Sequence, residues 1–168
     1  MNAEELRSVQ APLKTAYREL PHTALITLKA EGRIGHGLTC RVQTAKALID
    51  AGLHPATGGS GAYACSGDML LEALVACAGV TLSAVATAIG VELRGGTIKA
   101  EGVLDFRGTL GVAKEVPVGL QVIRLFFELE SDASDDQLNT LLRLTERYCV
   151  VLQTLAKPPV LEVNRRPV

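Results

Sequence analysis

The chain has 168 residues, with 17 lysines and arginines against 18 aspartates and glutamates, and 48% of its residues are hydrophobic. A chain of this length fits one domain with a substantial core. Aromatic residues make up only 4% and tryptophan is absent, which argues against a stacking surface for single-stranded nucleic acid. No dense basic run provides a footprint for duplex binding, so we predict no nucleic-acid partner.

The N-terminal stretch of residues 1–22 is polar and mixed in charge, and we interpret it as an arm preceding a single domain of residues 23–168. It has no apolar core of the signal-peptide type. We therefore expect a cytoplasmic protein, in which the four cysteines rest as thiols.

The first half of the domain predicts a β-hairpin followed by a connector. Residues 23–30 and 38–44 are typical of strands, and the glycine-rich residues 31–37 are typical of the turn between them. Residues 45–53 suggest a short helical turn. Glycine and proline punctuate residues 54–61, which we expect to be a loop that positions the next helix.

Residues 66–91 form the most distinctive stretch of the chain. Between positions 69 and 91 the only charged residue is Glu72, and strong helix formers dominate. Ser66 or Asp68 can cap the start of a helix here, and Gly90 can stop it. Because the helix is apolar on nearly every side, we expect it to be buried nearly all round. It is long enough to test as a membrane span, but its polar and small residues favour a core helix, and we predict no membrane partner.

The second half predicts a further pair of strands. Residues 97–106 alternate between apolar and polar side chains, as a half-buried strand does, and residues 120–130 repeat the pattern. Residues 107–117 are expected to form the long loop of this hairpin.

A capping box, Ser134 with Gln137 three positions later, predicts a second helix. Cys149 lies near its end, residues 150–157 continue helically after a kink, and residues 160–164 form a last strand. The resulting order β-β-α-β-β-α-β predicts an α+β fold rather than a doubly wound sheet.

Two separated cysteines attract attention. Cys77 lies in the middle of the long apolar helix, and Cys149 lies far along the chain at the end of the second helix. Either thiol could be an inert packed residue, since cysteine behaves as a small hydrophobe. The two could equally close a disulfide if the fold brings them together, which spacing alone does not decide.

The segments around these two cysteines together resemble the OsmC/Ohr family of thiol peroxidases. The run SGDMLLEALVACAGVTL at residues 66–82 is similar to the first family motif, and ERYCVVLQTL at residues 146–155 is similar to the second. The likeness extends over roughly residues 23–164. It implies an OsmC-like α+β fold, with an antiparallel sheet, a long central helix and a second helix, assembled as an intertwined homodimer.

The resemblance also implies a reaction. Cys77 would attack an organic hydroperoxide, Cys149 would resolve the resulting sulfenic acid, and a lipoyl-type or other small dithiol would reduce the disulfide. No metal or organic cofactor is implied. The chain departs from the family pattern at Ser66 and Val150, where the family usually has proline.

The chemistry sets requirements for the surroundings of Cys77. At an ordinary pKa near 8.5 only about 3% of a thiol is ionised at pH 7. Cys77 lies too far from the start of its own helix to profit from the helix dipole, and burial in apolar surroundings would raise its pKa. We therefore expect a cation from elsewhere, which would also orient the peroxide.

Arg33 is the first candidate for this cation, because the position resembles that of the family's catalytic arginine, and Arg41 is the alternative. Asp68 lies one residue after the position of the carboxylate that holds this arginine in the family, so it either replaces that carboxylate or caps the helix. Glu72 is a further auxiliary candidate, although it lies about 140° around the helix from Cys77.

Two other functions stay open on these residues. The chain could be a non-catalytic dimer that binds a small apolar ligand, or a thiol redox sensor that passes oxidation to a partner.

Cys40 and Cys65 match no family motif; Cys65 could compete as a resolving thiol, and Cys40 is interpreted as a packed strand residue. The three histidines, including His54 in the central loop, are scattered without zinc-ligand spacing, so no metal site is predicted.

Overall fold

The computed structural model describes residues 2–5, 8, 10, 11, 15, 19, 20, 31–34, 39–43, 48–111 and 113–166, and over 31–34 and 39–43 it describes the backbone. Its elements are β1 (Glu31–Ile34), β2 (Thr39–Gln43), β3 (Leu48–Gly52), a 3₁₀ turn η2 (Pro55–Thr57), β4 (Ala64–Cys65), α2 (Ser66–Ile89), β5 (Gly95–Leu104), α3 (Phe106–Thr109), β6 (Leu120–Glu130), α4 (Asp135–Tyr148) and α5 (Val150–Ala156).

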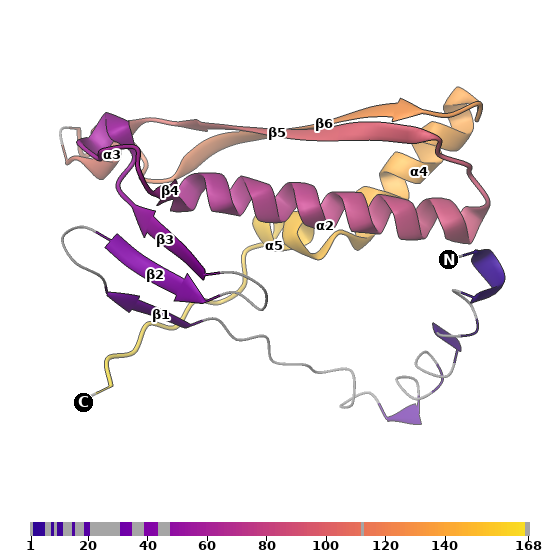
Figure 1. Ribbon diagram of the computed structural model, residues 1–168, viewed down its shortest axis with the longest axis horizontal. Helices are drawn as coiled ribbons and strands as arrows, with labels where there is room; N and C mark the ends of the chain where they lie inside the picture. The colour runs from indigo at the N-terminus through magenta and orange to yellow at the C-terminus, as the bar shows by residue number, and fades with distance from the viewer. Residues whose placement is uncertain are drawn as a thin grey trace.

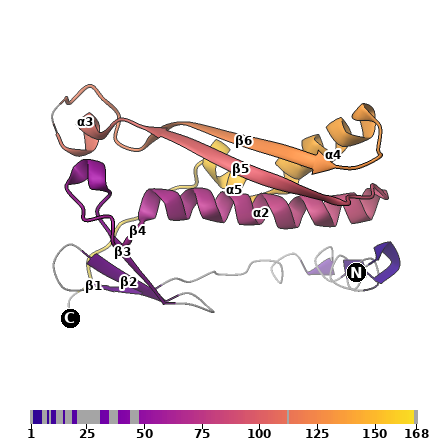
Figure 2. The ribbon, with the colours of Figure 1, turned by 45° about the horizontal axis from the view of Figure 1, so that its top comes forward.

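The helix α2 runs through the middle of the molecule, and the other elements lie against it (Figure 1). The long antiparallel hairpin β5–β6 covers one side of α2 along its length, and α4 and α5 pack beside it. A second sheet, in the order β1-β2-β3-β4, lies near the N-terminal end of α2 (Figure 2). Mixed sheets and helices in this arrangement confirm the α+β class.

The sheet β1-β2-β3-β4 differs from the sequence prediction in two places. The hairpin β1–β2 exists, but β1 occupies residues 31–34, which were expected to be the turn, while residues 23–30 lie outside the described residues. The helical turn expected over residues 45–53 is wrong, because Leu48–Gly52 is a strand that pairs with β2. Cross-strand pairing here overrides the weak helical preference of a short segment.

The strand expected at residues 160–164 is also wrong. This segment is extended but unpaired, and its apolar side chains Val160, Leu161 and Val163 are largely exposed. A strand requires a neighbour for its backbone hydrogen bonds, and the described part of a single chain provides none here.

The boundaries of α2 follow partly from the predicted caps. Gly90 ends the helix as predicted, with a φ of 74° and its N–H donating to the carbonyl of Ala86. The predicted N-cap is wrong, because the cap position is Cys65, and both Ser66 and Asp68 lie within the first turn.

Burial on nearly every side of α2 is also wrong for the single chain. Only one stripe with a spacing of four residues is buried, formed by Leu74, Ala78, Leu82 and Ala86. Away from this stripe Val80 is 74% exposed. By length and composition alone α2 could cross a membrane, and in the structure it packs against β5, α4 and α5.

The predictions for the second half are largely confirmed. β6 begins and ends where expected, and the Ser134–Gln137 capping box opens α4 with both of its hydrogen bonds present. The core has two clusters along α2. One gathers Leu82, Ala86 and Val91 around Leu141 of α4. The other gathers Leu74 and Ala78 around Cys149.

Candidate active site

The fold brings Cys77 and Cys149 together. Cys77 lies in the middle of α2, and Cys149 is the residue at which α4 ends and α5 begins. The two belong to one apolar cluster, in which Cys149 is 0% exposed and Cys77 is half-buried. Cys65, Cys77 and Cys149, whose side chains the structure describes, are all free thiols.

Several hydrogen-bond donors converge on the sulfur of Cys77. Burial by itself raises the pKa of Cys77, but the backbone N–H groups of Val151 and Val150 and the side chains of Cys149 and Thr81 donate to the sulfur and hold its pKa below the ordinary thiol value. Hydrogen bonds to an ionised group favour the ionised form. The site therefore favours a thiolate at Cys77.

These donors lower the pKa of Cys77 without a cation among the described residues, and the cation expected from Arg33 or Arg41 stays a prediction. The N–H groups at the start of a helix have no partner within that helix, and those of α5 are turned toward the sulfur. The sequence-based argument considered only the dipole of α2, which carries Cys77, and not the start of α5 beside it. The sequence signal for these N–H donors was the position of Cys149 directly before a helical segment.

Cys149 has the opposite character. Burial raises its pKa, and the adjacent Cys77 raises it further, while the backbone N–H groups of Leu152 and Val151 oppose this shift. The two neighbouring thiols therefore differ in acidity, with the pKa of Cys77 lowered and that of Cys149 raised. The more acidic thiol of such a pair is the better nucleophile near neutral pH.

An apolar cavity of about 510 Å³ lies along α2, and its lining begins about one helical turn after Cys77. It is lined by Gln10, Val80, Thr81, Ala84, Val85, Ala88 and Tyr148. Thr81 and Tyr148 connect it to the site, since Thr81 donates to Cys77 and Tyr148 directly precedes Cys149. The wall suits a carbon chain better than a small polar molecule.

The two candidate arginines occupy directly opposite positions in the β1–β2 hairpin. The register pairs Arg33 with Arg41, and Arg41 in turn with Asp50 of β3. The side chains of both arginines lie outside the described residues, so their distance from Cys77 stays a prediction.

The remaining candidates lie apart from the cysteine pair. Asp68 and Glu72 are exposed on the first turns of α2, and among the described residues neither donates to nor accepts from the thiols. Cys65 precedes Cys77 by twelve residues along a helix, a rise of about 18 Å, which is too far for a disulfide within one chain. The side chain of Cys40 lies outside the described residues.

His54 has a structural role in the described loop. Its Nδ1 accepts a hydrogen bond from the N–H of Ala56 at 3.0 Å and caps η2. Its ring stacks on Phe106, with 4.9 Å between the ring centroids. Within the described ranges no three His, Cys, Asp or Glu side chains gather as a metal site would require.

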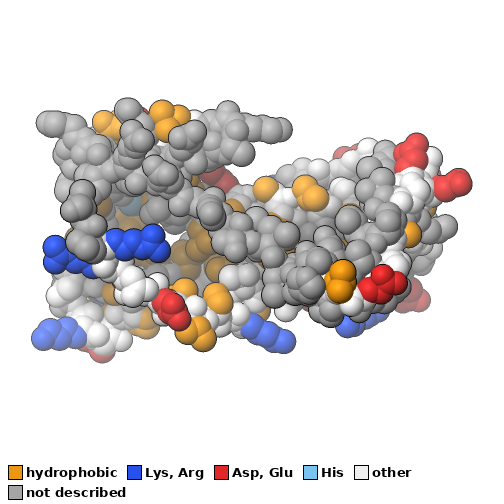
Figure 3. Space-filling view, turned by 90° about the horizontal axis from the view of Figure 1, so that it is seen from below, with side chains coloured by type: hydrophobic (Ala, Val, Ile, Leu, Met, Phe, Trp, Pro, Cys, Tyr) orange, Lys and Arg blue, Asp and Glu red, His pale blue; other side chains and the backbone are white. Residues whose placement is uncertain are grey.

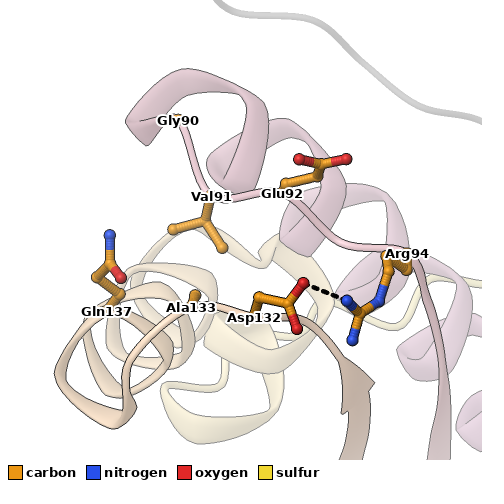
Figure 4. Close-up of a pocket in the computed structure, with 7 residues that line it drawn as sticks. All are labelled: Gly90, Val91, Glu92, Arg94, Asp132, Ala133 and Gln137. Atoms are coloured by element: carbon orange, nitrogen blue, oxygen red, sulfur yellow. Dashed lines mark hydrogen bonds and ion pairs between the residues drawn. The ribbon is translucent and has the colours of Figure 1, made fainter.

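A second pocket lies at the far end of α2 (Figure 4). It has a volume of about 210 Å³ and is lined by Gly90, Val91, Glu92, Arg94, Asp132, Ala133 and Gln137. Arg94 and Asp132 form an ion pair across it, and both side chains are exposed to solvent. An exposed ion pair of this kind is worth little energetically, and no thiol lies in this pocket.

The chain was compared with known proteins. Residues 59–164 match the model of the OsmC-like protein family. The fold is similar to that of an OsmC-like protein from Mycoplasma pneumoniae, with a TM-score of 0.66 and 17% identity over 79% of this chain and 89% of that one.

Two solved structures of organic hydroperoxide resistance proteins share the fold. An organic hydroperoxide resistance protein OsmC from Legionella pneumophila has a TM-score of 0.62 and 14% identity, over 79% of this chain and 91% of that one. An organic hydroperoxide resistance protein from Elizabethkingia anophelis has a TM-score of 0.64 and 14% identity, over 80% of this chain and 91% of that one. Comparison with curated proteins found no match.

Proposed function

Since this chain belongs to the OsmC-like protein family, we propose that it is a cysteine-based peroxidase that reduces organic hydroperoxides to alcohols. The observation that carries the proposal is the contact between a half-exposed Cys77, whose sulfur receives several hydrogen bonds, and a buried Cys149. Two relatives of the same fold are named as organic hydroperoxide resistance proteins, which supports the choice of substrate class.

The reaction would begin at Cys77. Its thiolate attacks the distal oxygen of the hydroperoxide, the S–O bond forms as the O–O bond breaks, and the alkoxide takes up a proton and leaves as the alcohol. Cys77 is then a sulfenic acid. Cys149 attacks this sulfur, and water leaves as the disulfide forms.

An external dithiol would complete the cycle. It attacks the disulfide, forms its own disulfide and returns both cysteines to thiols. Because Cys149 is 0% exposed and Cys77 is half-buried, the accessible sulfur for this attack is that of Cys77. We expect a slender dithiol of the lipoyl type to approach Cys77 through the apolar cavity that Thr81 lines.

A positive charge near the peroxide would assist the first step. Arg33 is the residue we assign to this role, with Arg41 opposite it on β2 as the alternative. A guanidinium with directed N–H groups would orient the hydroperoxide and stabilise the leaving alkoxide. Replacing Arg33 by lysine would keep the charge but lose this geometry.

The active form would be a homodimer. On α2, Val80 is 74% exposed and Leu70 is 40% exposed, and they lie only about 80° apart around the helix, which leaves an apolar surface on that side. Figure 3 shows hydrophobic side chains open to view on the lower face of the molecule. A second copy packed on this surface would bury it.

Peroxide turnover tests the proposal directly. Purified protein would be given cumene hydroperoxide with excess dihydrolipoamide or dithiothreitol, with hydrogen peroxide in parallel. We expect turnover that prefers the organic peroxide, is abolished in Cys77→Ser, and leaves Cys77 over-oxidised in Cys149→Ser. Turnover no higher than that of Cys77→Ser would reject the peroxidase and leave a ligand-binding protein as the better account.

A further inference from the structure

The geometry points to Thr81 as a further catalytic residue of the proposed peroxidase: it lies one helical turn after Cys77 on the same face of α2, and it lines the apolar cavity through which we expect the hydroperoxide to arrive. The inference rests on the proposed function for the identity of the substrate. The contact between Thr81 and Cys77 itself does not depend on that function.

The position of Thr81 follows from helix geometry. It lies four residues after Cys77 in α2, which places the two side chains on the same face, one turn apart. Both residues are half-buried, so their side chains border solvent-accessible space as well as the core. Thr81 also lines the cavity of about 510 Å³ along α2.

The hydroxyl of Thr81 is used differently from those of other helical residues. The hydroxyls of Ser83, Thr87, Thr145 and Thr154 each donate to the carbonyl four residues earlier, at 2.8 to 3.0 Å. Serine and threonine hydroxyl groups in a helix commonly find a hydrogen-bond partner in this way. Among the described residues the hydroxyl of Thr81 has no such carbonyl partner, and its side chain is one of the groups that lower the pKa of Cys77.

A hydroxyl in this place can serve two steps of the reaction. It donates to the thiolate before attack, which keeps the sulfur ionised and fixes its orientation. Because Thr81 lines the cavity and a hydroxyl can both donate and accept, its oxygen can also accept the O–H of an incoming hydroperoxide. The O–H of R–O–O–H would thereby place the distal oxygen against the sulfur.

Three variants separate this role from a structural one. Thr81→Val removes the hydroxyl at nearly constant shape, Thr81→Ser keeps it, and Thr87→Val is a matched control whose hydroxyl only contacts the helix backbone. The measurement is the rate of Cys77 alkylation by iodoacetamide between pH 5 and 10, with Cys149 replaced by Ser in every protein. Thermal unfolding verifies the fold, and Thr81→Ala replaces Thr81→Val if the latter does not fold.

For Thr81→Val we expect the pH midpoint of alkylation to rise and the rate at pH 7 to fall about fivefold, with Thr81→Ser close to the parent protein. Peroxide turnover in the Cys149-containing background should fall more than alkylation does, because the oxygen that accepts from the substrate is also lost. If Thr81→Val alkylates and turns over as Thr87→Val does, Thr81 has no catalytic role. If turnover is independent of Cys77, the proposed function fails, while the alkylation result still decides the contact.

Discussion

Cys149 is both the residue that ends α4 and the residue that precedes α5, and it packs against Cys77 of α2 in one apolar cluster. The junction between α4 and α5 therefore fixes the position of the Cys149 sulfur. Through the N–H groups at the start of α5 it also determines the environment of the Cys77 sulfur. Any change at this junction acts on both thiols at once.

The two thiols should react at very different rates. Cys77 is half-exposed and favours the thiolate, whereas burial keeps Cys149 neutral and inaccessible. With substoichiometric iodoacetamide at pH 7, we expect mass spectrometry of the native protein to find the label on Cys77, at least about tenfold above Cys149. In urea the two should label equally. Preferential labelling of Cys149 in the native protein would contradict the site.

The N–H of Val150 offers a test of how α5 acts on Cys77. Proline is well tolerated at the first position of a helix but has no N–H to donate. In Val150→Pro we expect the pKa of Cys77 to rise toward the ordinary thiol value, because one of the donors that favour the thiolate is lost. Alkylation at pH 7 should fall about three- to tenfold.

The lowered pKa of Cys77 also determines how its alkylation rate depends on pH. Because the pKa of Cys77 lies below that of an ordinary thiol, its alkylation rate should rise as the pH rises through that lowered value and level off above it. Val150→Ala keeps the N–H and should follow the parent curve. A Val150→Pro curve identical to that of Val150→Ala would show that this N–H does not act on the sulfur.

Local patterns determined much of this fold in advance. The capping box at Ser134 and the alternation over residues 120–130 are short-range signals, and the structure follows them. The strand at residues 48–52 could not be foreseen, because it depends on pairing with β2 rather than on its own composition. The same holds for residues 160–164, whose pattern suits a strand but whose single chain offers no described partner.

The site was predictable only in part. Motif resemblance selected Cys77 and Cys149, and the structure places them in one cluster. The donors to Cys77 were missed, because the backbone N–H groups of Val150 and Val151 carry no sequence signal of their own. A role for Thr81 could not be predicted, since nothing in a sequence shows whether a helical hydroxyl bonds to a carbonyl or to a neighbouring side chain.

The apolar surface of α2 predicts the assembly. Val80 is 74% exposed on the central helix, and a second copy is expected to cover it. Val80→Glu should therefore weaken the dimer, measured as a shift toward monomer in light scattering coupled to size exclusion. Val118 is 72% exposed in the loop before β6, and Val118→Glu is the matched control that should leave the dimer intact. A parent protein that is monomeric at 100 μM would contradict the proposed assembly.

The contact between α2 and α4 should contribute strongly to stability. Leu141 is 0% exposed and packs against Leu82, Ala86 and Val91. Leu141→Ala removes buried carbon and leaves a cavity, so we expect the free energy of unfolding to fall by about 2 to 5 kcal/mol. Urea unfolding at one fixed protein concentration measures this, since dimerisation would make the midpoint depend on concentration. Leu161→Ala, in the exposed C-terminal segment, should change it by less than about 0.5 kcal/mol. Equal losses for the two variants would mean that this cluster is not the core of the protein.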